Sequence, residues 1–194
     1  DVFVVEGSQV PIPMGLVAAA GKDPSDLRTH GAKFDELHRG GWDPTARLAE
    51  QDADGVAAEI IYPTVGMVLC NHPDFDYKDA CFTAYNRWLA EYCAGAPDRL
   101  FGLAQTAMAS VESAMRDVKW AKANGFVGMM MPGNPQLEDY DQPMYDPLWE
   151  CCADLGMPVC FHILTSKGSD VNTVFQGARG NRINQKLDAA ADKA

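Results

Sequence analysis

Between residues 43 and 163 the sequence alternates amphipathic helical segments with short, almost continuous apolar runs. The apolar runs begin at residues 57, 100, 126 and 158, and each follows a segment with helical periodicity. Runs that stay apolar at every position are typical of the strands of a parallel sheet with helices packed on it. This order predicts an α/β fold, either a doubly wound open sheet or part of a (β/α)8 barrel.

Capping residues mark the ends of the predicted helices. Asp43-Pro44 and Asp146-Pro147 each place an N-cap residue before a proline suited to the first helical position. We therefore expect helices between Asp43 and Gly55, from 76 to 94, between Ser110 and Gly125, and between Asp146 and Gly156. On the second of these helices the predicted buried stripe is Cys81, Tyr85, Trp88, Leu89 and Tyr92.

The regions outside this repeat differ from it in composition. Residues 1–42 contain two short apolar patches and then a mixture of glycine, proline, histidine and charged residues without a period. We interpret them as an N-terminal arm with a hairpin and a flap. Residues 43–165 form the βα-repeat domain, and residues 166–194 are expected to be a polar tail.

Charge and apolar content limit the partners of the chain. Sixteen Lys and Arg against 27 Asp and Glu give a net charge of −11, which disfavours binding to nucleic acid or to an anionic membrane surface. No stretch approaches the ~20 apolar residues that span a bilayer, and the first residues lack a signal-like run. The six cysteines include no CxxC pair and are predicted to be buried free thiols. These features predict a cytoplasmic protein.

Common cofactor and nucleophile motifs are absent from the sequence. It contains no GxGxxG, no GxxxxGK[ST] and no GxSxG, which disfavours a nucleotide-binding fold and a serine α/β-hydrolase. His162 stands at the end of the last apolar run, where parallel α/β folds bind their ligands. The position fits a divalent metal ligand and equally fits a core histidine that hydrogen-bonds a backbone carbonyl.

A second group of polar residues follows the first apolar run of the repeat. Cys70, His72, Asp74 and Asp76 could together bind zinc. Pro73 and the start of a predicted helix favour a different interpretation, a turn followed by a helix cap.

Three segments resemble one known family, the amidohydrolase-related (amidohydrolase 2) family, which includes aminocarboxymuconate-semialdehyde decarboxylase. The first comprises WDP at 42–44, RLAEQDADGV at 47–56 and IYPT at 61–64. The second comprises YNRWLAEYC at 85–93 and PDRLFG at 97–102, and the third YDPLW at 145–149, LGMPV at 155–159 and FH at 161–162. They cover residues 42–165 in the family's order.

The resemblance implies a TIM-barrel enzyme that uses a divalent metal, zinc first and manganese second. The implied reaction is hydrolysis or non-oxidative decarboxylation of a small organic acid or ring, which makes the protein a hydrolase or a lyase. Family ligands come from an Asp/His-x-His pair on strand one, histidines on strands five and six, and an aspartate on strand eight; His162 matches the strand-five ligand. The implied partners are a small-molecule substrate and further copies of the chain in a homo-oligomer.

The ends of the predicted strands supply candidate substrate contacts, and the sequence also departs from the family pattern. The candidates are Thr64, Gln105 with its neighbour Thr106, Asn134 and Thr165. Residues 2–5 carry no histidine, and the residues after 163 contain neither a histidine nor an apolar run. We therefore expect about strands two to five of a barrel from a metal-dependent enzyme of this family, whose chain is either inactive because it is truncated or receives its missing ligands from another copy. The alternative is a non-catalytic fragment that acts as an oligomeric or binding module.

Overall fold

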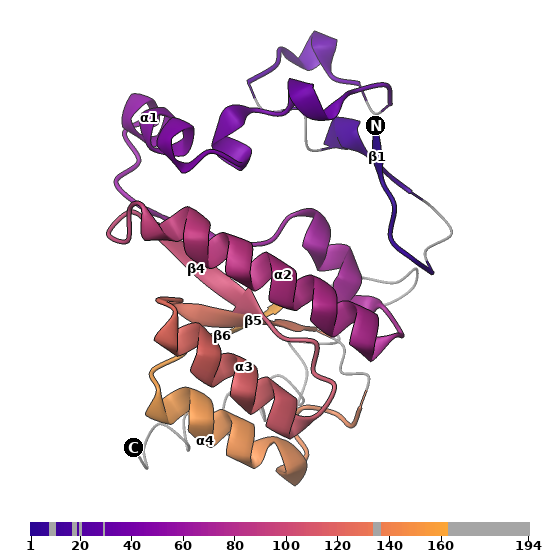
Figure 1. The fold of residues 1–194 in the computed structure, drawn as a ribbon, viewed down its shortest axis with the longest axis vertical. Helices are drawn as coiled ribbons and strands as arrows, with labels where there is room; N and C mark the ends of the chain where they lie inside the picture. The colour runs from indigo at the N-terminus through magenta and orange to yellow at the C-terminus, as the bar shows by residue number, and fades with distance from the viewer. Residues whose placement is uncertain (8–10, 17–18, 20, 29, 134–136, 163–194) are drawn as a thin grey trace. The chain divides into compact units, whose positions relative to one another are not determined.

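The structure is a computed structural model that describes residues 1–7, 11–16, 19, 21–28, 30–133 and 137–162 (Figure 1). Its α-helices are α1 (Pro44–Asp54), α2 (Phe75–Ala94), α3 (Val111–Ala123) and α4 (Asp146–Asp154). Its strands are β1 (Val2–Phe3), β2 (Ile12–Pro13), β3 (Glu59–Ile61), β4 (Leu100–Gln105), β5 (Gly128–Pro132) and β6 (Val159–His162). The chain divides into two compact units, one of residues 1–59 with 92–100 and one of residues 60–91 with the residues from 101 onward.

The first unit contains a short hairpin and helix α1. Strands β1 and β2 pair antiparallel, with Phe3 opposite Ile12. Helix α1 begins as the sequence predicts, because the Asp43 carboxylate accepts hydrogen bonds from the first free N–H groups of the helix, at 2.9 and 3.3 Å. It ends at Gly55, which has a φ of 69°, a conformation that glycine adopts without strain.

Two arginines fix the connection from α1 to β3. Arg47 on α1 forms a two-pronged ion pair with Glu59, with N–O distances of 2.5 and 2.6 Å, and this pairing lowers the pKa of the Glu59 carboxyl. Arg99 donates to the Asp52 carboxylate at 2.7 Å and to the carbonyl oxygens of residues 56 and 57. The chain therefore enters β3 along a defined path.

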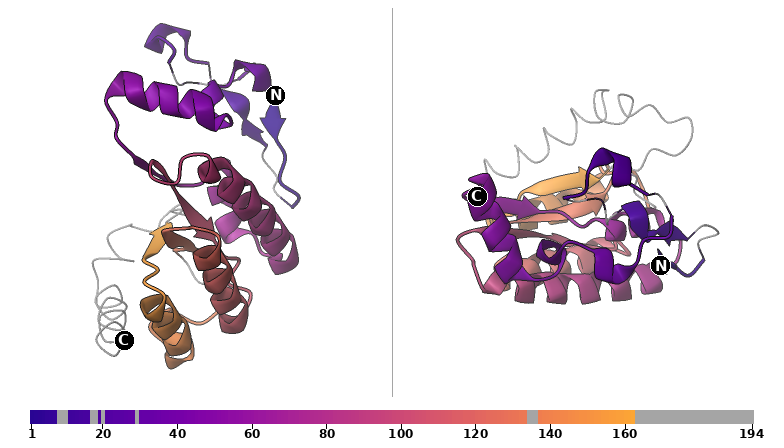
Figure 2. Two further views of the ribbon diagram at one scale, coloured as in Figure 1. Left: turned by 60° about the vertical axis from the view of Figure 1, so that its left-hand side comes forward. Right: turned by 90° about the horizontal axis from the view of Figure 1, so that it is seen from above.

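The second unit is built on the sheet. The strand order is β3-β4-β5-β6, and β4, β5 and β6 run parallel, with Gln105 opposite Met130 and Met130 opposite Cys160. Helices α2, α3 and α4 lie along one face of these strands (Figures 1 and 2). The order rises without a reversal, as in a barrel, whereas a doubly wound sheet reverses its order at a switch point. The predicted α/β alternation is confirmed, and the doubly wound alternative is excluded.

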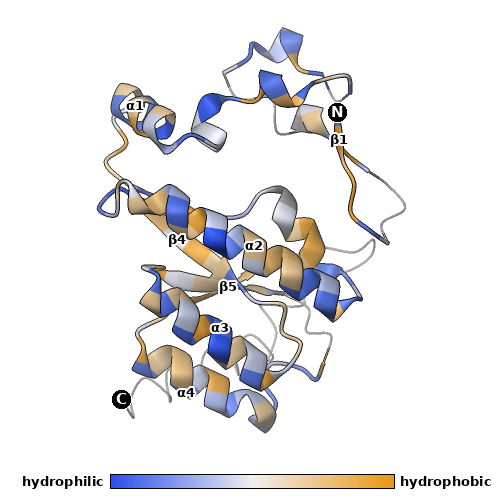
Figure 3. Ribbon diagram, in the orientation of Figure 1, coloured by the Kyte–Doolittle hydropathy of each residue, from blue (hydrophilic) through white to orange (hydrophobic). Residues whose placement is uncertain are grey.

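The interior of this unit contains apolar strands, and much of β4 has the colour of hydrophobic residues in Figure 3. Met129, Met130 and Met131 are fully buried, as the apolar run predicts. A Cβ atom at Gly102 would lie 3.0 Å from the Leu89 side chain of α2, so the glycine lets this helix approach β4 closely. All six cysteines are free thiols, as predicted, but only Cys70, Cys151 and Cys152 are buried, and Cys81, Cys93 and Cys160 are partly exposed.

The predicted buried stripe of α2 is partly wrong. Leu89 and Tyr92 are buried, but Trp88 is 39% exposed. The buried positions of the helix's first turns are instead Lys78, Phe82 and Asn86. Polar residues replace apolar ones on this face because their hydrogen-bond partners lie in other elements, at the end of β4 for Asn86 and at the Cys70 carbonyl oxygen for Lys78. None of the helices in the described residues is long and apolar enough to cross a bilayer.

The start of β5 provides a test of this packing. A Cβ atom added at Gly128 would lie 2.8 Å from the Pro158 carbonyl oxygen and 2.9 Å from the Leu103 side chain. We expect Gly128→Ala to reduce the free energy of unfolding by about 1–3 kcal/mol, measured by urea denaturation. Gly95→Ala is the control, since nothing lies within 4 Å of its added Cβ. Equal effects of the two substitutions would contradict this account.

Candidate functional site

The strands β3 to β6 end at one edge of the sheet, and this carboxyl edge is the candidate functional site. Gln105 is the last residue of β4 and His162 the last residue of β6, where its backbone lies opposite Pro132. Thr64 is exposed and lies directly before the 3-10 helix η5 (Val65–Asn71) that follows β3. The other two predicted substrate contacts, Asn134 and Thr165, lie outside the described residues.

Helix α2 holds the end of β4 through Asn86. The Asn86 side chain donates to the Gln105 carbonyl oxygen at 2.8 Å and accepts from the Gln105 N–H at 2.8 Å. Asn86 is 6% exposed, so these bonds form away from water. One side chain thereby satisfies both backbone groups of the last strand residue, which fixes the point at which the strand ends.

Helix α3 holds the next residue in a similar way. The buried Thr106 hydroxyl donates to the Asp117 carboxylate at 2.7 Å, and it accepts from the Met108 N–H at 3.3 Å. Met108 has a φ of 55°, in the left-handed region that non-glycine residues rarely adopt. Burial raises the pKa of the Asp117 carboxyl, and the Thr106 hydrogen bond opposes that shift.

The Gln105 side chain is the most unusual group at this edge. It is 1% exposed, yet neither its amide oxygen nor its amide nitrogen has a hydrogen-bond partner among the described residues. It lies against η5, since a Cβ atom at Gly66 would be 3.3 Å from its Nε2 atom. A buried polar group without a partner costs about 1–3 kcal/mol, so this amide is suited to binding a ligand that supplies the missing partner.

A buried lysine lies beside η5. Lys78 is 1% exposed, and its ammonium group lies 3.5 Å from the Cys70 carbonyl oxygen and 4.4 Å from the centre of the Phe75 ring. Burial lowers the pKa of Lys78 to about 8 and raises the pKa of the Cys70 thiol to about 11. Two unusual polar groups therefore lie beside η5. One is the Lys78 ammonium group, whose pKa is lowered, and the other is the Gln105 side-chain amide, which has no hydrogen-bond partner among the described residues.

The polar group at 70–76 forms a turn and a helix cap, as the favoured interpretation of the sequence predicts. The His72 ring accepts from the Asp74 N–H at 3.2 Å, and the Asp74 carboxylate accepts from the Tyr77 N–H at 3.0 Å. Within the described residues no three histidine, cysteine or acidic side chains gather to hold a metal ion. Three protein ligands are the usual minimum for a catalytic zinc, so these residues do not build a metal centre among themselves.

Asn86, Asp117 and Lys78 were not among the candidate site residues that the sequence suggests. Their partners lie in other elements, at the end of β4 or in η5, so no local spacing reveals them. The sequence signal for two of them was a lysine and an asparagine about two helical turns apart on α2, and the predicted apolar stripe included neither.

A run of parallel strands in sequential order, covered by helices on one face, makes this chain part of a (β/α)8 barrel, a fold whose active sites lie at the carboxyl edge of the strands. Residues 25–194 match the model of the Amidohydrolase (Amidohydro_2) family. The chain belongs to this family, and the resemblance seen in its sequence is confirmed.

Several relatives of known structure or activity are decarboxylases. The chain is 27% identical over 147 residues to 2-amino-3-carboxymuconate-6-semialdehyde decarboxylase of Dictyostelium discoideum, covering 72% of this chain and 39% of the relative. It superposes on 2,6-dihydroxybenzoate decarboxylase from Rhizobium with a TM-score of 0.58 at 22% identity, covering 93% of this chain and 56% of the other. A third is 5-carboxyvanillate decarboxylase of Novosphingobium aromaticivorans, with a TM-score of 0.56 and 25% identity, covering 73% of this chain and 42% of that one.

These coverages mean that the chain spans about half, or less, of the length of each of these relatives. The 5-carboxyvanillate decarboxylase contains bound manganese and 3-methoxy-4-hydroxy-5-nitrobenzoic acid. The fold shared with these proteins is that of the family barrel, of which this chain forms four consecutive parallel strands.

The hold of Asn86 on β4 can be tested directly. Asn86→Ala leaves two buried backbone groups of Gln105 without partners, so we expect the free energy of unfolding to fall by about 2–4 kcal/mol. Asn124→Ala is the matched control, because Asn124 is exposed and donates one bond to the Trp120 carbonyl oxygen. Urea denaturation measures both, and a loss at Asn86 no larger than that at Asn124 would contradict the assigned role.

Proposed function

We propose that this protein is a metal-dependent amidohydrolase-family enzyme that decarboxylates a small hydroxylated aromatic acid without an oxidant. The observation that carries the proposal is the family match over residues 25–194, together with three decarboxylases among its relatives. Hydrolysis of a small organic acid or ring is the alternative reaction of the same site. In the proposed reaction the carbon–carbon bond to the carboxylate breaks, CO2 leaves, and a proton takes its place on the ring.

We place the substrate at the carboxyl edge of the sheet. His162, at the end of β6, is proposed as the metal ligand that this chain provides, with zinc or manganese as the ion. Thr64, Gln105, Asn134 and Thr165 are the proposed substrate contacts. Among them Gln105 has the strongest support, because its buried amide has no partner in the described part of the protein. The described residues build no metal centre among themselves, so no step is assigned to the ion.

A second candidate is a non-catalytic module that binds small molecules or further copies of the chain. The observation in its favour is that the described residues contain no cluster of three metal-ligating side chains. The two candidates differ in turnover, which the following experiment measures.

We expect the full chain to release CO2 from 2,6-dihydroxybenzoate or 5-carboxyvanillate when manganese or zinc is supplied. Addition of a chelator should stop this release of CO2. His162→Ala should reduce the rate by about 100-fold or more, because a metal ligand is lost. His72→Ala is the matched control, since the His72 ring lies in the turn before α2, accepts from the Asp74 N–H and packs on Tyr77. Absence of turnover with either metal would favour the binding module.

Gln105→Met gives a test with two opposite readouts. Removing an unpaired buried amide should raise the free energy of unfolding of the ligand-free protein by about 1 kcal/mol, measured by urea denaturation. The same substitution should weaken substrate binding by about tenfold, seen in KM or in the thermal shift given by 2,6-dihydroxybenzoate.

Gln142→Met is the control, because Gln142 is an exposed glutamine on a different segment. It should change neither quantity. A destabilised Gln105→Met protein that still binds the acid normally would assign Gln105 a purely structural role.

A further inference from the structure

The 3-10 helix η5 covers two buried polar side chains at once. Its Gly66 backbone lies against Gln105, since a Cβ atom there would be 3.3 Å from the Gln105 Nε2 atom. Its Cys70 carbonyl oxygen lies 3.5 Å from the Lys78 ammonium nitrogen. Gln105 and Lys78 are each 1% exposed, so a ligand that bonds the Gln105 amide needs part of this cover to move.

η5 is held less firmly than the strand end beneath it. It is a seven-residue 3-10 helix, and hydrogen bonds of this helix type have poorer geometry than those of an α-helix. The Thr64 side chain does not cap its first turn, and Val68 at its middle is 38% exposed. The backbone of Gln105, in contrast, forms two hydrogen bonds of 2.8 Å with the buried Asn86 side chain. Movement at this place is therefore easier for η5 than for β4.

The two side chains that η5 covers also weaken its attachment. The Gln105 amide has no hydrogen-bond partner among the described residues, so it gains hydrogen bonds from water when η5 moves away. The Lys78 ammonium group is charged and buried, and exposure restores its hydration. Both groups favour an open position of η5. The apolar contacts of Met67 and Leu69 with the buried cluster around Cys70 favour the closed one.

We propose that η5 is a lid that controls access to the Gln105 amide, and that its opening exposes Lys78 and the Cys70 thiol. The lid rests on the proposed role of Gln105 as a substrate contact. It does not require that the bound acid be decarboxylated.

Opening of this lid is linked to a proton through Lys78. Burial lowers the pKa of Lys78 to about 8 in the closed position, whereas an exposed lysine has a pKa of about 10.4. Between these two values the closed protein holds a neutral Lys78, and opening takes up a proton. The ratio of open to closed protein is therefore constant well below pH 8 and falls as the pH rises through 8. Alkaline pH favours the closed lid.

The titratable groups around Lys78 leave this pH range to the lysine. The Cys70 thiol of η5 acts on Lys78, and burial raises the pKa of that thiol to about 11. The Tyr140 phenol acts on Cys70, and burial raises the pKa of this phenol above its ordinary value. His72, directly after η5, packs on the Tyr77 ring. We therefore assign the pH dependence of opening between pH 7 and pH 9 to Lys78.

Labelling of the Cys70 thiol with iodoacetamide measures opening in the ligand-free full chain, because Cys70 is 1% exposed. Peptide mass spectrometry compares it with Cys152 of α4, a thiol that is 2% exposed and lies outside η5. We expect Cys70 to react at least tenfold faster than Cys152. Lys78→Met and Gln105→Met should each slow the labelling of Cys70 by about tenfold at pH 7, because methionine gains no hydration on exposure. The controls Lys122→Met and Gln142→Met change exposed residues and should leave the rate unchanged.

The pH dependence tests the role of Lys78 separately. The Cys70 labelling rate of the unmodified chain, divided by that of Lys78→Met, should fall about tenfold from pH 7 to pH 9. This ratio cancels the ionisation of the thiol itself. A constant ratio, equal labelling of Cys70 and Cys152, or faster labelling in both methionine variants overturns the proposal.

Binding of the acid tests whether η5 controls access. Lys78→Met should slow the association of 2,6-dihydroxybenzoate by the same factor as it slows labelling, and an unchanged association rate overturns the lid. Labelling that follows the expected pattern in a chain that releases no CO2 supports the lid and contradicts only the proposed reaction.

Discussion

The way in which β4 ends is the constraint on which the rest of the carboxyl edge depends. Asn86 from α2 satisfies both backbone groups of Gln105, and Asp117 from α3 accepts from the hydroxyl of Thr106. Neighbouring residues of a strand point to opposite faces, so the two helices hold the strand end while the Gln105 side chain points away from the Thr106 side. The amide is consequently buried against η5 without a partner. A precise strand end and an unpaired polar group are two consequences of the same arrangement.

The order of the elements was predictable because it depends on local chemistry. The Asp43 and Ser110 side chains cap α1 and α3, and both residues are placed at these helix starts by the sequence pattern. The strands followed from short apolar runs between helices. The buried face of α2 was not predictable in the same way, because hydrophobic periodicity favours Trp88 and assigns no weight to Asn86 or Lys78. Those two are buried because their partners belong to other elements, and a periodicity count contains no such information.

The candidate site was predictable only in part, for a related reason. Gln105 follows from a rule about parallel strands, since ligands collect at their carboxyl ends. No rule of that kind identifies Asn86 or Asp117. Each bonds a residue outside its own helix, and these partners are 19 and 11 residues away in the sequence. The assignment of His162 as a metal ligand rests on a resemblance, and the described residues do not complete a ligand set around it. Family membership therefore indicates where to look for a site, and the packing of α2 and α3 shows which side chains shape that end of the sheet.

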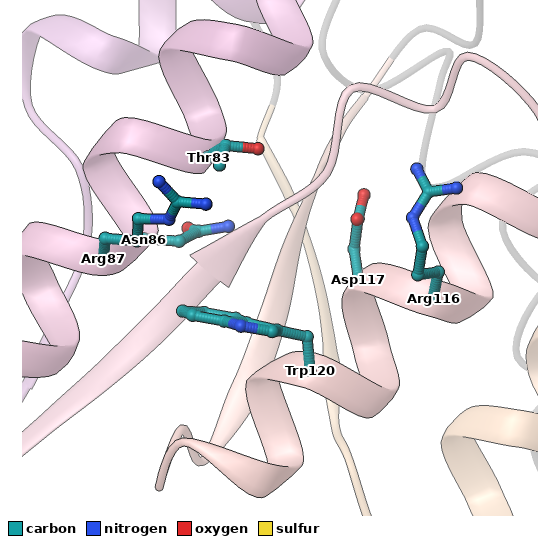
Figure 4. A pocket seen from close by; sticks show the side chains of 6 residues that line it. All are labelled: Thr83, Asn86, Arg87, Arg116, Asp117 and Trp120. Carbon is teal, nitrogen blue, oxygen red and sulfur yellow. The ribbon is translucent and has the colours of Figure 1, made fainter.

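A cavity of about 170 Å³ between α2 and α3 (Figure 4) shares two of its lining residues with the contacts that hold the end of β4. Asn86 lines the cavity and also bonds the backbone of Gln105, and Asp117 lines it and also bonds Thr106. Burial raises the pKa of the Asp117 carboxyl, and the hydrogen bond from Thr106 opposes that shift. The side chains that separate α2 from α3 are therefore the same ones that fix the end of β4, so a substitution at either position changes both places together.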